Sequence, residues 1–469
     1  MGRYKKLISN TVILGIGTFS SKLLVFLMMP FYTRWLMPAE FSTADLIAQT
    51  ANLLIPLACI GIIDGIFRFT LDGDGEQKKT FTSGLFVLFI SSVIFVLLAL
   101  AFNLLFDLGE INTYMSLVAG YVIAANFHSA IAQYIRAKGN TTLFAVGGII
   151  GTALTIGFNV LFLFVFDMGV IGYVLSVVVA DVAVSVVLFA SARLYKDIDV
   201  RQIEGKKIRD MLKYSIPMIP TTVFWWITNV SDRYMVTAIK GSEINGLYTA
   251  AYKIPTLLTL VCMVFIEAWQ FSAVDEKDED ERKSFFTTVF GAYQGAMFIA
   301  ASGLILFSKL ATRILLAESY YESWKFIPVL AIAMTYSSLV TFMGSVYLVK
   351  KKSVMSFVTS AIGALVNIGL NFLLIPVLSA NGAAIATAVS YMLVMVIRGV
   401  NARKYVSFSM GTLRLVFNTL VVIGQGAVMV FEIKYWIPLQ ILLFALLTAV
   451  NGRVIIKGII SILRKEKKL

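Results

Sequence analysis

Long, uninterrupted apolar runs are the feature that most limits how this chain can fold. Each run is about as long as a helix needs to cross the hydrocarbon core of a bilayer, roughly 20 residues. Membrane-spanning strands would instead alternate apolar and lumen-facing residues in shorter segments. The pattern therefore predicts an all-α integral membrane protein with about 14 transmembrane helices. The predicted spans are residues 10–33, 42–65, 82–106, 112–133, 143–166, 169–191, 215–238, 245–269, 285–308, 326–348, 354–375, 379–398, 412–431 and 437–456.

The overall composition excludes several other classes of protein. Of 469 residues, 58% are hydrophobic and only 14% are charged, whereas soluble chains are about 25% charged. Cys59 and Cys262 both lie in apolar runs, so neither a disulfide framework nor a zinc site is expected. The sequence also carries no catalytic constellation. We expect no enzymatic activity, no metal site and no cofactor.

Basic residues are concentrated on one side of the predicted membrane. If the helices cross in turn, 30 of the 40 lysines and arginines lie in loops on the side of the two termini, and 6 lie opposite. Loops rich in lysine and arginine stay in the cytoplasm. We therefore predict cytoplasmic termini, and we interpret the net charge of +13 as a topology signal. No nucleic-acid partner is expected, because the cations are scattered over short loops.

The chain divides into two halves with similar sequence patterns. The longest polar break, residues 193–213, separates six predicted helices from the next six. "GFNVLFLFVFDMGVIGY" and "GLNFLLIPVLSANGAAIA" occupy corresponding places, each with an asparagine followed by an outer turn containing glycine. We predict six-helix bundles at 1–205 and 206–405 related by a pseudo-two-fold axis, and a two-helix hairpin with a basic tail at 406–469.

Several charged residues fall inside or at the ends of predicted spans. A charge at mid-bilayer costs about 2.5–3.5 kcal/mol, so these residues should line a wet cavity or pair across helices. The pairing alternative joins Lys22 to Asp45 or Asp64, and Lys253 to Asp232. The mid-span set is Lys22, Asp45, Asp64, Asp181, Asp232, Arg233 and Lys253, and Arg34 and Arg68 lie at span ends.

Three other polar residues in spans have two interpretations each. Asn367 and Asn371 are one helical turn apart, and could either contact sugar hydroxyls or bridge helices. Asp181 could either couple to an ion or hydrogen-bond between helices. His128 is the only histidine. We interpret it as a packed polar residue, with a proton-transfer role as the alternative.

Several stretches resemble polysaccharide flippases of the multidrug/oligosaccharidyl-lipid/polysaccharide exporter superfamily. They are "IPLACIGIIDGIFRFTL", "WWITNVSDRYMV", "NGLYTAAYKIP", "YYESWKFIPVLAIAM" and "LVNIGLNFLLIPVLSANGAAIATAVSY", which together cover both halves. The resemblance implies an O-antigen- or capsule-type flippase in the bacterial cytoplasmic membrane. Its substrate would be a polyprenyl-pyrophosphate-linked oligosaccharide, moved by alternating access. Its other partners would be the lipid bilayer and the polymerase and glycosyltransferases of the pathway.

The resemblance also assigns roles to the charged residues. The predicted diphosphate and sugar contacts are Lys22, Arg233, Lys253, Arg68, Arg34, Asn367 and Asn371. The predicted ion-coupling residues, for Na⁺ or H⁺, are Asp45, Asp64, Asp181 and Asp232. Arg34 and Arg68 have the alternative of reaching to the interface. Two other functions stay open: a drug/cation antiporter of the same superfamily, and a lipid II-type flippase for peptidoglycan precursors.

Overall fold

The chain forms two compact helical units in a computed structural model. The structure describes residues 23–466, apart from residue 25 and residues 73–74, 106–109, 276–278 and 350–352. No strand occurs in this described part of the chain. Unit 1 comprises Met1–Trp226 and unit 2 comprises Ile227–Leu469. The division between the units falls inside one helix (α10), while the predicted bundle boundary at residue 205 stays a prediction.

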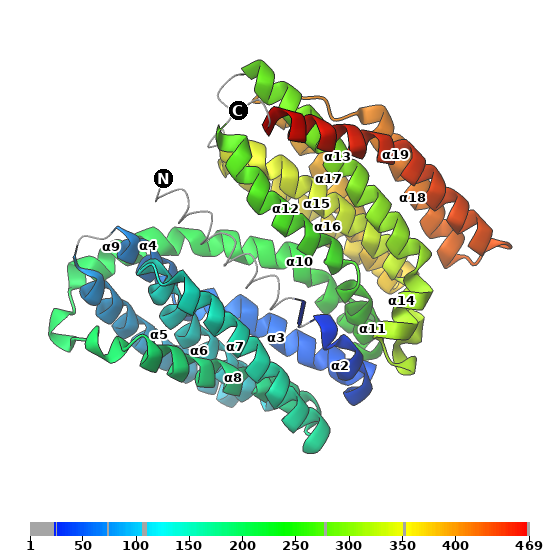
Figure 1. The fold of residues 1–469 in the computed structure, drawn as a ribbon. Helices are drawn as coiled ribbons and strands as arrows, with labels where there is room; N and C mark the ends of the chain where they lie inside the picture. Colours follow the sequence, from blue (N-terminus) through cyan, green and yellow to red (C-terminus); the bar gives the residue numbers. More distant parts are fainter. Residues whose placement is uncertain are drawn as a thin grey trace. The chain divides into compact units, whose positions relative to one another are not determined.

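Helices account for most of the described chain, and Figure 1 labels them in sequence colours. Unit 1 contains α2 (Met29–Trp35), α3 (Pro38–Ala58), α4 (Ile62–Leu71), α5 (Gln77–Leu105), α6 (Glu110–Ala137), α7 (Thr141–Asn159), η1 (Val160–Val165), α8 (Gly169–Ser191), η2 (Leu194–Lys196), η3 (Val200–Gln202), α9 (Gly205–Ser215) and η4 (Ile216–Met218). The helix shared by both units is α10 (Ile219–Lys240). Unit 2 continues with α11 (Ser242–Lys253), α12 (Thr256–Asp275), α13 (Glu279–Leu306), α14 (Ser308–Leu315), η5 (Glu318–Lys325), α15 (Ile327–Val349), α16 (Ser353–Leu378), α17 (Ala380–Ala402), α18 (Thr412–Val430) and α19 (Trp436–Glu466).

The described helices confirm a multi-pass membrane protein. Ten of them are long and apolar enough to cross a membrane, or eleven if the bent pair α3 and α4 is one span. Most of the first predicted span lies outside the described residues. The predicted all-α membrane architecture is therefore confirmed, and the count of 14 spans stays a prediction.

Proline and glycine break two of the predicted spans. The run at 42–65 bends by 59° between α3 and α4, where Ile60 and Gly61 have φ values of 52° and 65°. Pro56, one turn earlier, has no backbone N–H to donate. The run at 245–269 breaks between α11 and α12, at Ile254 and Pro255. Such breaks are tolerated in a membrane only where other groups satisfy the freed backbone, and Asn126 donates to the Ile55 carbonyl at 3.2 Å.

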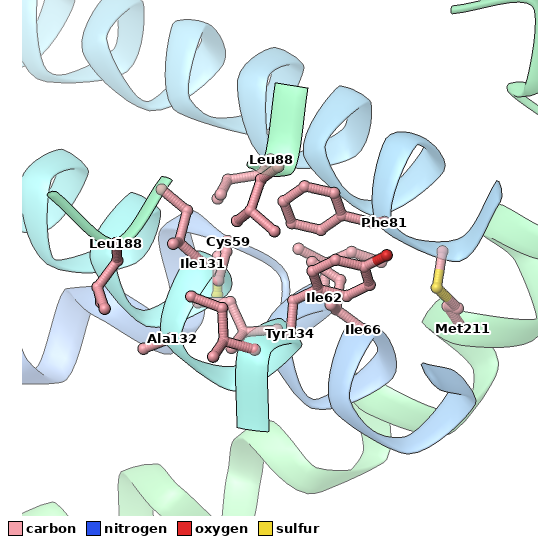
Figure 2. Packing of buried hydrophobic residues seen from close by; sticks show 14 of the residues in the cluster. Cys59, Ile62, Ile66, Phe81, Leu88, Ile131, Ala132, Tyr134, Leu188 and Met211 are labelled. Atoms are coloured by element: carbon pink, nitrogen blue, oxygen red, sulfur yellow. The ribbon is translucent and has the colours of Figure 1, made fainter. Parts of the chain in front are cut away.

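An apolar core joins α4, α5, α6, α8 and α9 within unit 1. Figure 2 shows Ile62 and Ile66 of α4 beside Phe81, Ile131 and Tyr134. The rings of Phe81 and Tyr134 stack with centroids 3.9 Å apart. Burying such side chains stabilises a fold by about 1.5–3 kcal/mol each in water, although the gain is smaller where the alternative surroundings are lipid.

Close packing attaches the connector after α8 to unit 1. A Cβ on Gly65 of α4 would lie 2.9 Å from the Met211 Cβ of α9, so only glycine allows this approach. Earlier in the connector, Asp197 accepts from Lys138 Nζ at 2.6 Å and from Tyr134 Oη at 3.2 Å. These contacts explain why the compact unit extends past residue 205.

Unit 2 is built around an aromatic core and a firmly attached helix pair. Phe342 of α15 lies 5.1 Å from Phe290 and 5.4 Å from Tyr293, measured between ring centroids. Asn418 of α18 and Asn451 of α19 exchange two hydrogen bonds of 2.9 Å. The C-terminal hairpin is thus held together by buried polar contacts as well as by apolar packing.

The two outer turns that looked repeated in sequence have related geometry. Each contains a non-glycine residue with positive φ, Asp167 at 50° and Ser379 at 55°. In each, a glycine of the following helix lies against a carbonyl of the preceding one: Gly172 against Phe162 and Gly382 against Leu374. A side chain at either glycine would clash with that backbone. This local correspondence supports the predicted internal repeat.

Candidate functional site

Three of the predicted charged residues lie on two consecutive helices of unit 2. Asp232 and Arg233 are adjacent on α10, and their side chains are buried. Lys253 is the last residue of α11 and is half-buried. A lysine at this position is favoured electrostatically, because the C-terminus of a helix carries a partial negative charge.

Two tyrosines of α11 contact this charged pair. Tyr248 Oη donates to Asp232 Oδ2 at 2.7 Å. The Arg233 guanidinium carbon lies 5.0 Å from the ring centroid of Tyr252, within the range of a cation–π interaction. Tyr248 and Tyr252 are one helical turn apart, so a single face of α11 supplies both contacts.

This arrangement places a buried guanidinium of unit 2 beside an aromatic ring and next in sequence to a buried carboxylate. A guanidinium that stacks on an aromatic face is held in one plane, and its N–H groups point outward in that plane. Groups of this geometry bind carboxylate and phosphate oxygens with two parallel hydrogen bonds. A role for this group in binding an anion stays a prediction.

A second polar contact links α10 to α17. Tyr391 Oη donates to Asn229 Oδ1 at 2.9 Å, and Tyr391 also hydrogen-bonds the side chain of Ser337 on α15. Neither contact follows from the sequence pattern. The only signal was that Asn229 and Ser337 are polar residues within apolar runs, which does not identify their partners.

The two predicted asparagines form a hydrogen-bonded chain that links α16 to α17 through Asn367. Asn371 Nδ2 donates to Asn367 Oδ1 at 3.0 Å, and Asn367 Nδ2 donates to Thr387 Oγ1 of α17 at 3.2 Å. Both side chains are at most 1% exposed. The structure thus shows the geometry of the bridging alternative, and a role in contacting sugar stays a prediction.

Two further arginines of unit 2, one buried and one half-buried, were missed as site candidates. Arg398 was counted from sequence as a cytoplasmic loop residue, but it lies inside α17 and is 5% exposed. Its guanidinium donates to neutral oxygens of Thr359, Val340 and Ser360 at 2.9–3.0 Å. Arg414 donates to the Gly291 carbonyl and to Gln294 Oε1 at 3.0 and 3.1 Å. Among the described residues, neither arginine forms a salt bridge with a carboxylate.

Unit 1 contains a different kind of charged site. His128 Nδ1 of α6 lies 2.8 Å from Asp181 Oδ1 of α8, and both side chains are partly buried. Asp45 of α3 is 4% exposed and lies 3.5 Å from Gln49 Nε2. The hydrogen bond between helices was one of the two predicted alternatives for Asp181.

The remaining predicted residues lie elsewhere. Asp64 is exposed in the first turn of α4. Arg68 pairs with Asp72 at 2.9 Å, and both side chains are substantially exposed. Arg34 is exposed in the last turn of α2. Lys22 lies outside the described residues, so its proposed pairing with Asp45 or Asp64 stays a prediction.

The described residues contain no cluster that could hold a metal ion. No three or more histidine, cysteine, aspartate or glutamate side chains in that part of the chain are grouped suitably. The chemistry available at the described sites is ion pairing, hydrogen bonding and proton exchange.

Comparison with protein families finds one match. The family model described as "Polysaccharide biosynthesis protein" matches residues 7–270, more than half of the chain. The search of curated proteins gives no match.

Solved structures share the fold over most of the chain. A structure titled "Lipid II flippase MurJ, inward closed conformation" has a TM-score of 0.72 and 14% sequence identity, covering 96% of this chain and 100% of that one. An outward-facing multidrug resistance MATE family transporter of the MOP superfamily has a TM-score of 0.60 and 14% identity, covering 85% and 95%. A MOP superfamily transporter from Pyrococcus furiosus has a TM-score of 0.62 and 14% identity, covering 86% and 96%. The fold is thus one found in flippases and transporters.

Proposed function

Because the chain belongs to the polysaccharide biosynthesis protein family, we propose that it is a flippase for polyprenyl-diphosphate-linked oligosaccharide. It moves this lipid from the cytoplasmic to the outer leaflet of the bacterial cytoplasmic membrane, where its termini face the cytoplasm. The family and the fold are those of flippases and transporters, which move substrates without converting them.

Arg233 is the observation that supports this function most. Burying an uncompensated charge costs several kcal/mol, yet α10 keeps an almost fully buried guanidinium beside the ring of Tyr252. A substrate diphosphate also needs partners in place of its hydration shell. Charge-assisted hydrogen bonds from Arg233, with Lys253 as a second cation, would meet that need.

The transport step we propose is alternating access. The two units would expose the diphosphate site to one leaflet and then to the other, while the polyprenyl tail remains in lipid. Coupling to an ion gradient would give the cycle its direction.

The pathway chemistry defines the other expected partners. Glycosyltransferases at the cytoplasmic face must build the oligosaccharide on its lipid, and a polymerase at the outer face must consume it. O-antigen-type and capsule-type glycans both fit this description.

A peptidoglycan precursor is the second candidate substrate. The solved structure titled as a lipid II flippase covers 96% of this chain, compared with 85–86% for the MATE-type matches. Such a precursor has the same diphosphate and polyprenyl tail, so Arg233 would bind its diphosphate equally well. A drug/cation antiporter remains the third alternative, and it would export organic cations instead.

Substitution of Arg233 tests the proposed function. In cells that rely on this protein, we expect Arg233→Gln to reduce surface glycan at least tenfold and to cause lipid-linked oligosaccharide to accumulate. The amount of surface glycan in Arg233→Lys should lie between those of wild type and Arg233→Gln, because lysine keeps the positive charge and lacks the planar guanidinium. Mass spectrometry of extracted lipids identifies the accumulated glycan and separates oligosaccharide from peptidoglycan precursor.

Arg453→Gln provides the matched control, since Arg453 is exposed on α19. It should leave surface glycan unchanged. Normal export by Arg233→Gln, at wild-type abundance in the membrane, would contradict the proposed role of Arg233.

A further inference from the structure

The connector between α8 and α10, residues 192–218, lies across one end of unit 1. It begins directly after Ser191, the last residue of α8. The Thr82 hydroxyl of α5 donates to the Asp197 carbonyl at 3.2 Å, and Lys138, just past the end of α6, donates to the Asp197 carboxylate at 2.6 Å. Since α5, α6 and α8 are candidate membrane spans, the connector lies at the boundary where three spans leave the membrane.

The acidic side chains of the connector are mostly used in contacts within unit 1. Glu204 forms a salt bridge with Lys79 of α5, and Asp197 is buried in the contact with α6. The carboxylate of Asp199 accepts from a backbone N–H of its own turn at 3.1 Å. Of the connector's four acidic residues, each of which the structure describes, only Asp210 is exposed.

The basic side chains of the connector are mostly exposed. On α9, Lys206, Arg209 and Lys213 follow one another at intervals of three and four residues, so they share one face of the helix. The opposite face carries Met211 and Ser215, which pack against α4 (Figure 1). Six exposed cations of the connector form no salt bridge with another described residue: Arg193, Lys196, Arg201, Lys206, Arg209 and Lys213.

Exposed apolar side chains alternate with these cations along the connector. Tyr195, Val200 and Ile216 are 57%, 72% and 46% exposed. Apolar and aromatic side chains that alternate with lysine and arginine are typical of segments lying in the headgroup layer of a bilayer. An acidic protein partner would explain the cations, but it would not explain why they lie beside apolar groups at the ends of membrane spans.

We propose that the exposed surface of the connector binds anionic phospholipids of the adjacent leaflet. Headgroup phosphates accept charge-assisted hydrogen bonds from lysine and arginine, and each such residue near an anionic membrane surface strengthens the attraction about fivefold. A topology signal needs only the number of cations in a loop, whereas lipid binding needs cations that are exposed and not already paired. This lipid site is independent of the transported substrate, and on the predicted topology it faces the cytoplasmic leaflet.

A fluorophore attached to the connector reports which lipids gather there. Val200→Cys provides the attachment point, because Val200 is exposed and the native Cys59 and Cys262 are buried. The labelled full-length protein is placed in phosphatidylcholine vesicles with a small fraction of spin-labelled phosphatidylglycerol or, in parallel, of spin-labelled phosphatidylcholine. We expect quenching about three times as strong from the anionic lipid. High salt should reduce this preference, because it screens exposed charges.

Removing three of the cations tests the site itself. The triple variant Arg201→Gln, Lys206→Gln and Arg209→Gln should lose most of the preference for the anionic lipid. A variant with Arg201→Lys and Arg209→Lys keeps every charge and should keep the preference, which separates the effect of charge from any effect on folding.

The matched control removes three exposed cations from unit 2 and changes the net charge of the protein equally. It carries Arg403→Gln, Lys404→Gln and Arg453→Gln, and it should keep the preference for the anionic lipid. Equal quenching by the two lipids, or no quenching by either, in protein with an intact connector would overturn the proposal. So would a preference that survives in the triple variant or is lost equally in the control.

Discussion

At the scale of single residues, several buried charges of this protein contact neutral polar groups and aromatic rings. Arg398 donates to hydroxyl and carbonyl oxygens, Arg233 stacks on Tyr252, and Asp232 accepts from Tyr248. A buried ion needs such partners, because an uncompensated one costs several kcal/mol. The sequence indicates which charges are buried, but their partners depend on how each helix is rotated.

Removing one hydroxyl tests this account of Asp232. We expect Tyr248→Phe to lower the free energy of unfolding by about 1.5–3 kcal/mol, the usual range for a hydrogen bond to a charged group. The loss arises because the Asp232 carboxylate stays buried with one donor fewer. Equilibrium unfolding in mixed detergent micelles measures it.

Tyr252→Phe is the control on the same helix. It keeps the ring that contacts Arg233 and removes only a hydroxyl, so its effect should be less than half that of Tyr248→Phe. Equal losses for the two variants would show that Asp232 gains nothing specific from Tyr248.

At the scale of helices, the length of an apolar run predicts well where a helix lies. It predicts poorly where a helix breaks within the run. The predicted run at 169–191 coincides with α8, whereas 42–65 becomes α3 and α4 with a 59° bend. Pro56 and Gly61 were visible signals of that bend. The prediction of one continuous span relied on the apolar composition instead, because proline often occurs in membrane helices without ending them.

The helix pair α18 and α19 provides a prediction at this scale. We expect Asn418→Ala and Asn451→Ala each to lower the free energy of unfolding by about 1–2 kcal/mol, since hydrogen bonds between membrane helices reach about that size. The two amides bond each other twice. The double variant should therefore lose clearly less than the sum of the single losses.

Thr448→Ala is the control on α19, because the Thr448 hydroxyl is exposed and, among the described residues, bonds only the Phe444 carbonyl of its own helix. It should change the free energy of unfolding little. If the loss of unfolding free energy in the double asparagine variant equals the sum of the two single losses, the Asn418–Asn451 pair does not hold α18 against α19.

At the scale of the whole molecule, the two units differ in the charges they bury. Unit 1 buries Asp45 and holds the His128–Asp181 pair. Unit 2 buries Arg233 and Arg398 as well as Asp232. On the proposed function, the substrate diphosphate binds to the cations of unit 2.

The fold and the family were predictable from sequence, because bilayer thickness fixes helix length and the motifs cover both halves. The candidate site was predictable only in part. Asp232, Arg233 and Lys253 stand out as charges in apolar runs. Arg398 was mistaken for a loop residue, since it ends its apolar run close to Arg403 and Lys404. The His128–Asp181 contact joins residues 53 positions apart, and helical periodicity cannot specify such a contact.

Reconstituted flipping tests the central claim most directly. Purified wild-type protein and Arg233→Gln are placed in separate vesicles with a fluorescent polyprenyl-diphosphate oligosaccharide, and its transfer between leaflets is followed by quenching. We expect wild type to transfer this lipid at least tenfold faster than Arg233→Gln, and to leave an uncharged polyprenyl glycoside in place. Equal rates for the two proteins, or equal transfer of charged and uncharged lipids by wild type, would contradict the claim that a buried cation carries a diphosphate across the membrane.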